Sequence, residues 1–136
     1  MVKWRNLSVI VMAVLSFAGC ENTGGKVAVS GTVTLQGQLV DKGTIDFLLP
    51  EATQSTAQAS IEKGQYSLPA MQGLLPGKYR VKISAIEAFD ITPEEYAKGK
   101  KAPPPKELIP AKYNTQSQEI VEVQKAGPNR FDFKIE

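Results

Sequence analysis

Histidine is absent from the 136-residue chain, and its absence removes several kinds of active site. Without it there is no Ser-His-Asp or Cys-His nucleophilic site, no histidine-ligated zinc, and no side chain whose unshifted pKa lies near neutral pH. Along the expected strands the acidic residues are spread one by one, and no Asp-x-Asp-x-Asp loop of the calcium-binding type is present. We therefore expect no enzyme, no metal site and no cofactor, and we place four acids at turns or on the surface: Asp41, Asp46, Asp90 and Asp132.

The chain also lacks a second cysteine and an excess of charge. Cys20 is the single cysteine, so no disulfide can form within the chain. Of the 16 basic residues, Lys3 and Arg5 precede Cys20, which leaves 14 basic residues against 14 acidic ones in the rest of the chain. A net charge of zero without a basic stripe argues against a nucleic-acid partner.

The segment before Cys20 predicts a cleaved export signal. The 11-residue apolar run at 7–17 follows Lys3 and Arg5, and it is shorter than the ~20 residues that a membrane-spanning helix needs. With Ala18 and Gly19 before the cysteine, the segment resembles the lipobox of bacterial lipoproteins, although Phe17 replaces the usual smaller aliphatic residue. We expect a signal at 1–19, a tether at 20–26 lipidated at Cys20, and a membrane-anchored protein on the non-cytoplasmic side of the cell envelope. An ordinary secretory signal cut near Ala18 is the alternative.

Residues 27–136 predict a single all-β domain. Apolar and polar residues alternate in short segments separated by Gly and Pro, and this period of two is typical of half-buried strands. The expected strands are 27–35, 45–49, 56–61, 65–68, 79–85, 118–124 and 130–136. With no long helical period, they indicate a seven-stranded antiparallel β-sandwich. Five aromatic residues share strand faces with Val, Ile and Leu and are therefore expected in the core: Phe47, Tyr66, Tyr79, Phe131 and Phe133.

Residues 87–116 interrupt this rhythm and form the candidate interaction loop. The sequence Thr-Pro-Glu-Glu at 92–95 matches a helix capping box, which predicts a short helix to about Lys98, stopped by Gly99. Three cations are expected at its C-terminal end, where they complement the helix dipole or attract an anion: Lys98, Lys100 and Lys101. Three aromatics outside the strands are candidates for partner contacts: Phe89, Tyr96 and Tyr113. Phe89 and Tyr113 have the alternative role of packing the loop onto the sandwich.

Several short segments together carry a resemblance to a known family. They are 29–33 (VSGTV), 43–47 (GTIDF), 64–68 (GQYSL) and 75–81 (LPGKYRV). In this order the chain resembles the carboxypeptidase-regulatory-like, transthyretin-like domains. It is most similar to small single-domain lipoproteins of planctomycete-type bacteria, through 109–114 (IPAKYN) and 131–133 (FDF). The resemblance implies a seven-stranded Greek-key sandwich and no reaction. The family's hydroxyisourate hydrolases depend on histidines and a Tyr-Arg-Gly-Ser ending, neither of which is present.

Two functions remain open from the sequence. The first is a non-enzymatic, lipid-anchored envelope module with a structural or protein-interaction role. The second is a carbohydrate-binding module for envelope or extracellular polysaccharide, which requires exposed, roughly coplanar aromatics around Tyr96 and Tyr113. A hydrolase that uses carboxylates would need two converging acids, and no spacing in the sequence indicates such a pair.

Overall fold

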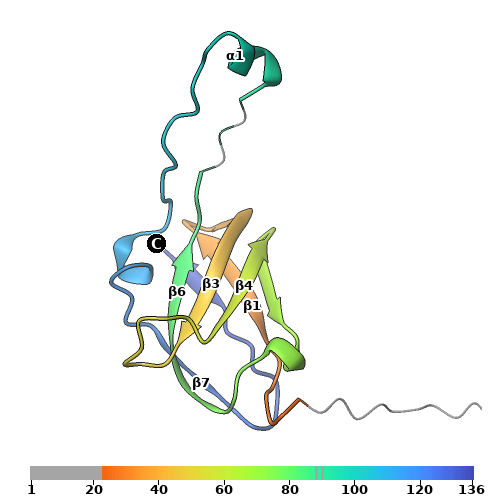
Figure 1. The fold of residues 1–136 in the computed structure, drawn as a ribbon. Coiled ribbons are helices and arrows are strands. Elements are labelled where there is room, and N and C mark those ends of the chain that lie inside the picture. The colour runs from red at the N-terminus through yellow and green to blue at the C-terminus, as the bar shows by residue number, and fades with distance from the viewer. Residues whose placement is uncertain (1–22, 88, 90) are drawn as a thin grey trace, which may run out of the picture.

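The computed structural model describes residues 23–87, 89 and 91–136, and Figure 1 shows their arrangement. The strands are β1 (Val29–Leu35), β2 (Gln38–Leu39), β3 (Lys42–Leu48), β4 (Ala57–Glu62), β5 (Gln65–Leu68), β6 (Gly77–Ser84), β7 (Ile120–Val123) and β8 (Phe133–Ile135). The helical elements are the 3-10 turns η1 (Ala70–Gln72) and η2 (Ala111–Tyr113) and the short helix α1 (Pro93–Ala97). The predicted signal at 1–19 and Cys20 lie outside the described residues.

The strands confirm the predicted all-β, sandwich-like architecture. They follow one another in the order β2-β1-β5-β4-β3-β6-β7, with antiparallel neighbours throughout. Because β3, β4 and β5 are consecutive and β6 returns to lie beside β3, this part of the sheet is a Greek key. β8 adds to β1 in parallel, which is the exception to the antiparallel pattern. All seven expected strands are present, and the two-residue β2 is an addition.

The core lies between the inward faces of the strands. Four of the five aromatics expected there are buried, namely Phe47, Tyr66, Tyr79 and Phe133, and Phe131 is half-buried against them. Two expectations at β3 were wrong, namely that Leu49, the last residue of the expected strand 45–49, faces the core and that Asp46 lies at a turn or on the surface. Leu49 is 51% exposed because β3 ends one residue before it, whereas Asp46 is buried and accepts hydrogen bonds from Ser55 Oγ and Gln58 Nε2. The carboxylate of Asp46 thus ties the β3–β4 loop to the sheet.

A tight seam joins β1 to the C-terminal segment. Phe131 N donates to Ser30 O at 2.9 Å, and Tyr66 Oη donates to Phe131 O at 2.7 Å. Both bonds lie close to Gly31. A Cβ at this position would lie 1.8 Å from Phe131 O and 2.8 Å from Tyr66 Oη, so the seam requires glycine here. Burial, with the nearby charge of Asp132, raises the pKa of Tyr66, while Arg130 opposes the rise, so the hydroxyl remains a donor at neutral pH.

Next to this seam, the side chain of Asp132 accepts the hydrogen bond that a neighbouring strand would otherwise accept. Asp132 Oδ1 accepts from both Thr32 N and Thr32 Oγ1, each at 2.8 Å, where the regular ladder between β1 and β8 has not yet begun. Hydrogen bonds from Thr32 lower the pKa of Asp132, helped by Arg130, although slight burial acts the other way. Asp132 is therefore a surface acid, as expected from the sequence, and its carboxylate also holds the C-terminal segment to β1.

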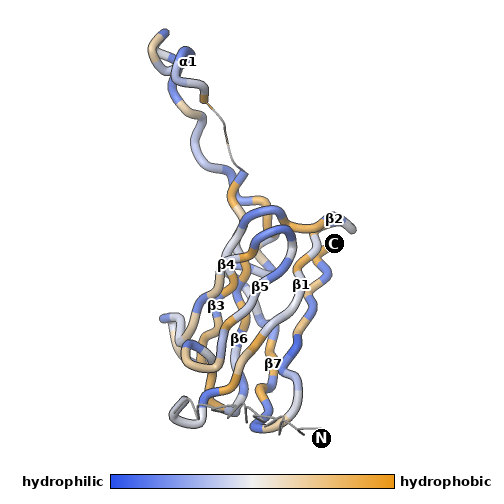
Figure 2. The backbone as a smooth tube through the Cα atoms, turned by 90° about the vertical axis from the view of Figure 1, so that its right-hand side faces the viewer, coloured by the Kyte–Doolittle hydropathy of each residue, from blue (hydrophilic) through white to orange (hydrophobic). Residues whose placement is uncertain are grey.

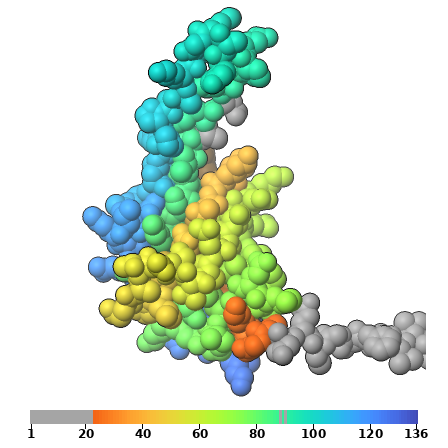
Figure 3. Space-filling view, viewed as in Figure 1, coloured from red at the N-terminus to blue at the C-terminus, as the bar shows by residue number. Residues whose placement is uncertain are grey.

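The strands give the sandwich two distinct ends (Figures 1 and 2). At one end, the tether pole, residues 23–28 enter β1 and the chain turns after β3, β5 and β7. At the other end, the arm pole, lie the β1–β2 turn, the end of β6 and the C-terminus. From the arm pole the chain runs out to α1 and back, and Figure 3 shows this projection standing clear of the body.

The projecting segment is shorter than the predicted loop. Its two limbs are joined at the base, where Glu87 N donates to Lys106 O and Leu108 N donates to Ala85 O. We call residues 87–106 the arm. The rest of the predicted loop returns to the sandwich, since Ile109 is 3% exposed and Asn114 is also buried, as is Ser117 just after the loop. These residues lie against β6, where Ser117 Oγ donates to Val81 O.

Candidate functional site

The tip of the arm has the predicted helix cap. Glu95 N donates to Thr92 Oγ1 at 3.3 Å and Thr92 N donates to Glu95 Oε2 at 3.2 Å, which completes the capping box. Lys100 Nζ lies 2.7 Å from Glu95 Oε1, and this ion pair, with the Thr92 bonds, lowers the pKa of Glu95. No residue of α1 is buried. Local hydrogen bonds thus hold the tip without any contribution from a core.

The six predicted interaction residues do not form one site. Tyr96 is 77% exposed at the tip, and Lys98 and Lys101 are exposed beside it, while Lys100 is engaged with Glu95. Phe89 lies on the outgoing limb and is 40% exposed. Tyr113, in contrast, belongs to η2 and packs against the core.

The two tyrosines are therefore separated by the length of the arm (Figure 1). The ring of Tyr113 is also covered from one side by Lys112, whose Nζ is 4.8 Å from the ring centroid. The structure does not bring Tyr96 and Tyr113 into the shared aromatic platform that the carbohydrate hypothesis required.

Glu107 fixes the base of the arm, although nothing in the sequence singled it out. Its carboxylate accepts from Ser84 Oγ at 2.5 Å and Ala85 N at 2.9 Å, at the end of β6, and from Ile109 N at 3.0 Å. Partial burial acts to raise the pKa of Glu107, but these hydrogen bonds outweigh it and lower the pKa overall. A single acid before two apolar residues forms no recognisable motif, so only the structure reveals these hydrogen bonds of Glu107. We call them the Glu107 latch.

An apolar groove of about 420 Å³ lies beside the arm base. Its exposed apolar side chains are Leu39 at 60%, Ile86 at 55% and Leu108 at 39%, and the exposed polar residues Gln38, Asp41, Lys42 and Glu87 also line it. The groove opens where the β3–β6 ladder ends at Thr44 and Ser84 and the outgoing limb leaves the sheet. The arm pole therefore combines an exposed apolar surface with the exposed aromatics of the arm.

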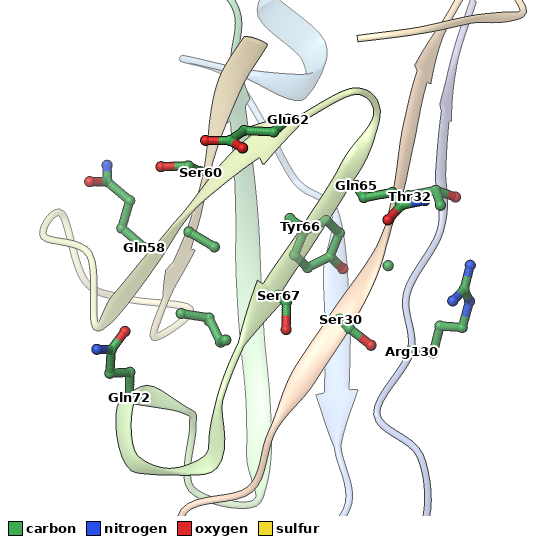
Figure 4. A pocket seen from close by; sticks show the side chains of 13 residues that line it. Ser30, Thr32, Gln58, Ser60, Glu62, Gln65, Tyr66, Ser67, Gln72 and Arg130 are labelled. Atoms are coloured by element: carbon green, nitrogen blue, oxygen red, sulfur yellow. The ribbon is translucent and has the colours of Figure 1, made fainter. Parts of the chain in front are cut away.

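A second, larger hollow of about 690 Å³ crosses the outer face of β1, β5 and β4 (Figure 4). Alternation turns the polar side chains of these strands outward, and the register sets Ser30 opposite Ser67 and Thr32 opposite Gln65. Short side chains form the floor, whereas Gln58, Glu62, Gln72 and Arg130 form the rim. We call this hollow the polar groove.

The polar groove presents hydrogen-bonding groups that the protein itself does not use. Across the part of the chain that the structure describes, the side chains of Ser30, Ser60, Gln65 and Ser67 have no protein partner. Hydroxyls and amides both donate and accept, so the groove suits a neutral, hydroxyl-rich ligand. The ring of Tyr66 lies beneath the surface at 3% exposure and offers no stacking face.

Comparison with known proteins adds no functional assignment, because no protein-family model and no curated protein matches this sequence. Among residues 23–87, 89 and 91–136, no three metal-ligating side chains gather into a cluster. Within the same residues, no helix has the length and hydropathy needed to cross a membrane.

Proposed function

We propose that the protein is a non-enzymatic, lipid-anchored module of the cell envelope that binds a protein partner through its arm pole. The observation that carries this proposal is the placement of tether and arm at opposite ends of the sandwich (Figure 1). An anchor at Cys20 would hold the tether pole near the membrane. The arm would then extend away from the membrane, toward other envelope components.

The arm itself supports a role in recognition. Residues 87–106 contribute nothing to the core among the described residues, and Tyr96 is 77% exposed at the tip. Large aromatics are the side chains that most often anchor protein interfaces. A rigid base also favours binding, because the Glu107 latch limits the entropy lost when the arm docks.

The family interpretation is part of the same proposal. The Greek key, the buried Tyr66 and Tyr79, and the bend at Pro76 before β6 support membership of the carboxypeptidase-regulatory-like, transthyretin-like domains. Such domains serve mainly as accessory, adhesive or structural modules. The absence of histidine from the sequence further favours a module without catalysis.

Photo-cross-linking in cells tests the interaction. A photoreactive amino acid at Tyr96 is expected to capture a specific envelope protein, whereas the same group at Lys134, exposed on β8 of the sandwich body, captures none. Detachment by Cys20→Ala is expected to abolish the product. Equal products at both positions, or none at Tyr96, would contradict a partner at the arm.

The polar groove supports a second candidate function, the binding of a neutral polysaccharide. Its open face, about 690 Å³ in volume, offers unpaired hydroxyls and amides that match sugar hydroxyls. On a glycan array, Ser67→Tyr should block binding by filling the floor, while Tyr96→Ala should leave it unchanged. Binding that depends on Tyr96 instead would place the sugar on the arm and exclude the groove.

A further inference from the structure

We infer that the tether pole is a membrane-contacting face, on which Met71 and Leu75 touch the lipid bilayer and hold the sandwich upright. This inference rests on the proposed anchor at Cys20. Met71 is 61% exposed and Leu75 is 50% exposed, and both belong to the loop between β5 and β6. The core does not explain these two side chains, because the buried residue of this loop is Leu74, at 1% exposure.

The tether is fixed against this loop. Val27 N donates to Leu74 O at 2.8 Å, and Leu74 N donates to Val27 O at 3.2 Å. A Cβ on Gly73 would lie 2.0 Å from Val27 O, so only glycine permits this approach. Closer to Cys20 in the sequence, a Cβ on Gly25 would lie 3.7 Å from Leu75 Cδ2, so the tether runs directly beside Leu75. The point where the chain leaves the sandwich is therefore set by backbone bonds and close packing.

Chain length then limits how far this face can lie from the bilayer. Five peptide units separate Cys20 from Gly25, and a fully extended chain spans at most ~3.6 Å per residue. Lipid at Cys20 would thus keep Gly25, which lies beside Leu75, within about 18 Å of the anchoring point, even with the tether stretched. A shorter conformation of the tether allows the two apolar side chains to reach the depth at which interfacial residues enter the headgroup region.

The charge next to the tether fits the same partner. Lys26 is exposed beside Gly25 and makes no ion pair with any described residue. A cation near a bilayer surface is attracted by anionic lipid headgroups. Apolar side chains flanked by a cation are typical of a surface that rests in the membrane interface. The opposite pole also exposes apolar residues, but the segment that leads to Cys20 enters the sandwich at the tether pole.

Fluorescence quenching by lipids tests the contact. The lipoprotein is purified with its own lipid and reconstituted into vesicles of phosphatidylethanolamine and phosphatidylglycerol with brominated acyl chains. Trp4, the only tryptophan in the sequence, lies in the predicted signal, so the processed protein has none. Leu75→Trp and Met71→Trp serve as separate reporters at the tether pole. Leu39→Trp is the matched control, because Leu39 is a leucine of similar exposure, 60%, at the arm pole.

Brominated lipids are expected to quench the Leu75→Trp and Met71→Trp proteins severalfold more strongly than the Leu39→Trp protein. Equal quenching at both poles, with an acyl chain found on Cys20 by mass spectrometry, would overturn the membrane-contacting face and leave the anchor intact. Absence of an acyl chain on Cys20 would overturn both the anchor and this inference. Two reporters at the tether pole ensure that misfolding of one variant, detected by circular dichroism, does not decide the result.

Discussion

Substitution of Gly31 by alanine probes the seam between β1 and the C-terminal segment. The added Cβ would lie 1.8 Å from Phe131 O, and ordinary contact begins at 3.4 Å, so the carbonyl must move by about 1.6 Å. Such a shift breaks the Tyr66 Oη bond to Phe131 O and the Phe131 N bond to Ser30 O. We therefore expect the seam to open locally while the remaining strands stay paired.

The expected cost is large for a single methyl group. A buried hydrogen-bonding group left without a partner costs about 1–3 kcal/mol, so two lost bonds cost about 4 kcal/mol. Replacing glycine restricts the unfolded chain and returns about 0.5–1 kcal/mol, which leaves a net destabilisation of about 3 kcal/mol. With a urea m-value of about 2 kcal/mol/M, the unfolding midpoint should fall by about 1.5 M.

Urea unfolding followed by circular dichroism measures this change in a secreted Cys20→Ala form. Ser30→Ala is the matched control, because Ser30 is the adjacent residue and its side chain faces the polar groove; its effect should stay within about 0.5 kcal/mol. Tyr66→Phe should cost about 1–2 kcal/mol, and its effect should not add fully to that of Gly31→Ala because both remove the same bond. A Gly31→Ala protein as stable as the control would refute the crowding argument.

Three further predictions concern the arm and acid pH. Deleting 93–105 should change the free energy of unfolding by less than about 0.5 kcal/mol, because no residue of α1 is buried. Loss of a cooperative urea transition in this variant would show that the arm supports the core. Glu107→Gln should accelerate amide hydrogen exchange at 85–109, while the control Glu94→Gln, at the tip of the arm, should leave the exchange of that segment unchanged. Equal protection of these amides in both variants would contradict the Glu107 latch. Because folding lowers the pKa of Glu107 and Asp132, both carboxylates stabilise the fold at neutral pH, and this contribution should be lost as the pH falls from about 5 through their folded-state pKa values. Asp132→Asn should weaken this pH dependence. A urea unfolding midpoint that does not change on acidification would contradict the prediction.

Alternation in the sequence was sufficient to predict the strands because the expected strands turn one face to the core, with the end of β3, buried on both faces, as the exception. Residues 79–85 show this most clearly, with Tyr79, Val81 and Ile83 buried and Lys78 and Lys82 turned outward. The capping box at 92–95 was equally predictable, since its hydrogen bonds link residues three apart in the chain. Signals of this kind are local, and the structure confirms both.

Features that depend on distant residues could not be predicted in this way. The pairing of β1 with β8, the requirement for Gly31 and the latch at Glu107 each join segments that no local pattern relates. The interaction residues were assigned by their position in an irregular loop, and that criterion grouped Tyr113 with Tyr96 although one packs on the core and the other stands at the tip. Likewise, the polar groove arises from the register of three strands, which alternation within each strand does not reveal.

The parallel pairing of β1 with β8 also determines when the domain can be completed. The first strand lies between β5 and the last residues of the chain, and Val33 pairs with Phe133 across 100 residues of sequence. Contacts at such separation are closed late and slowly, so folding on the millisecond-to-second scale typical of non-local β-proteins is expected. Until β8 is in place, β1 is paired with β2 and β5, and the edge that β8 occupies stays open. The sandwich is therefore incomplete until β8 has paired with β1, and any truncation that removes β8 leaves that side of the first strand exposed.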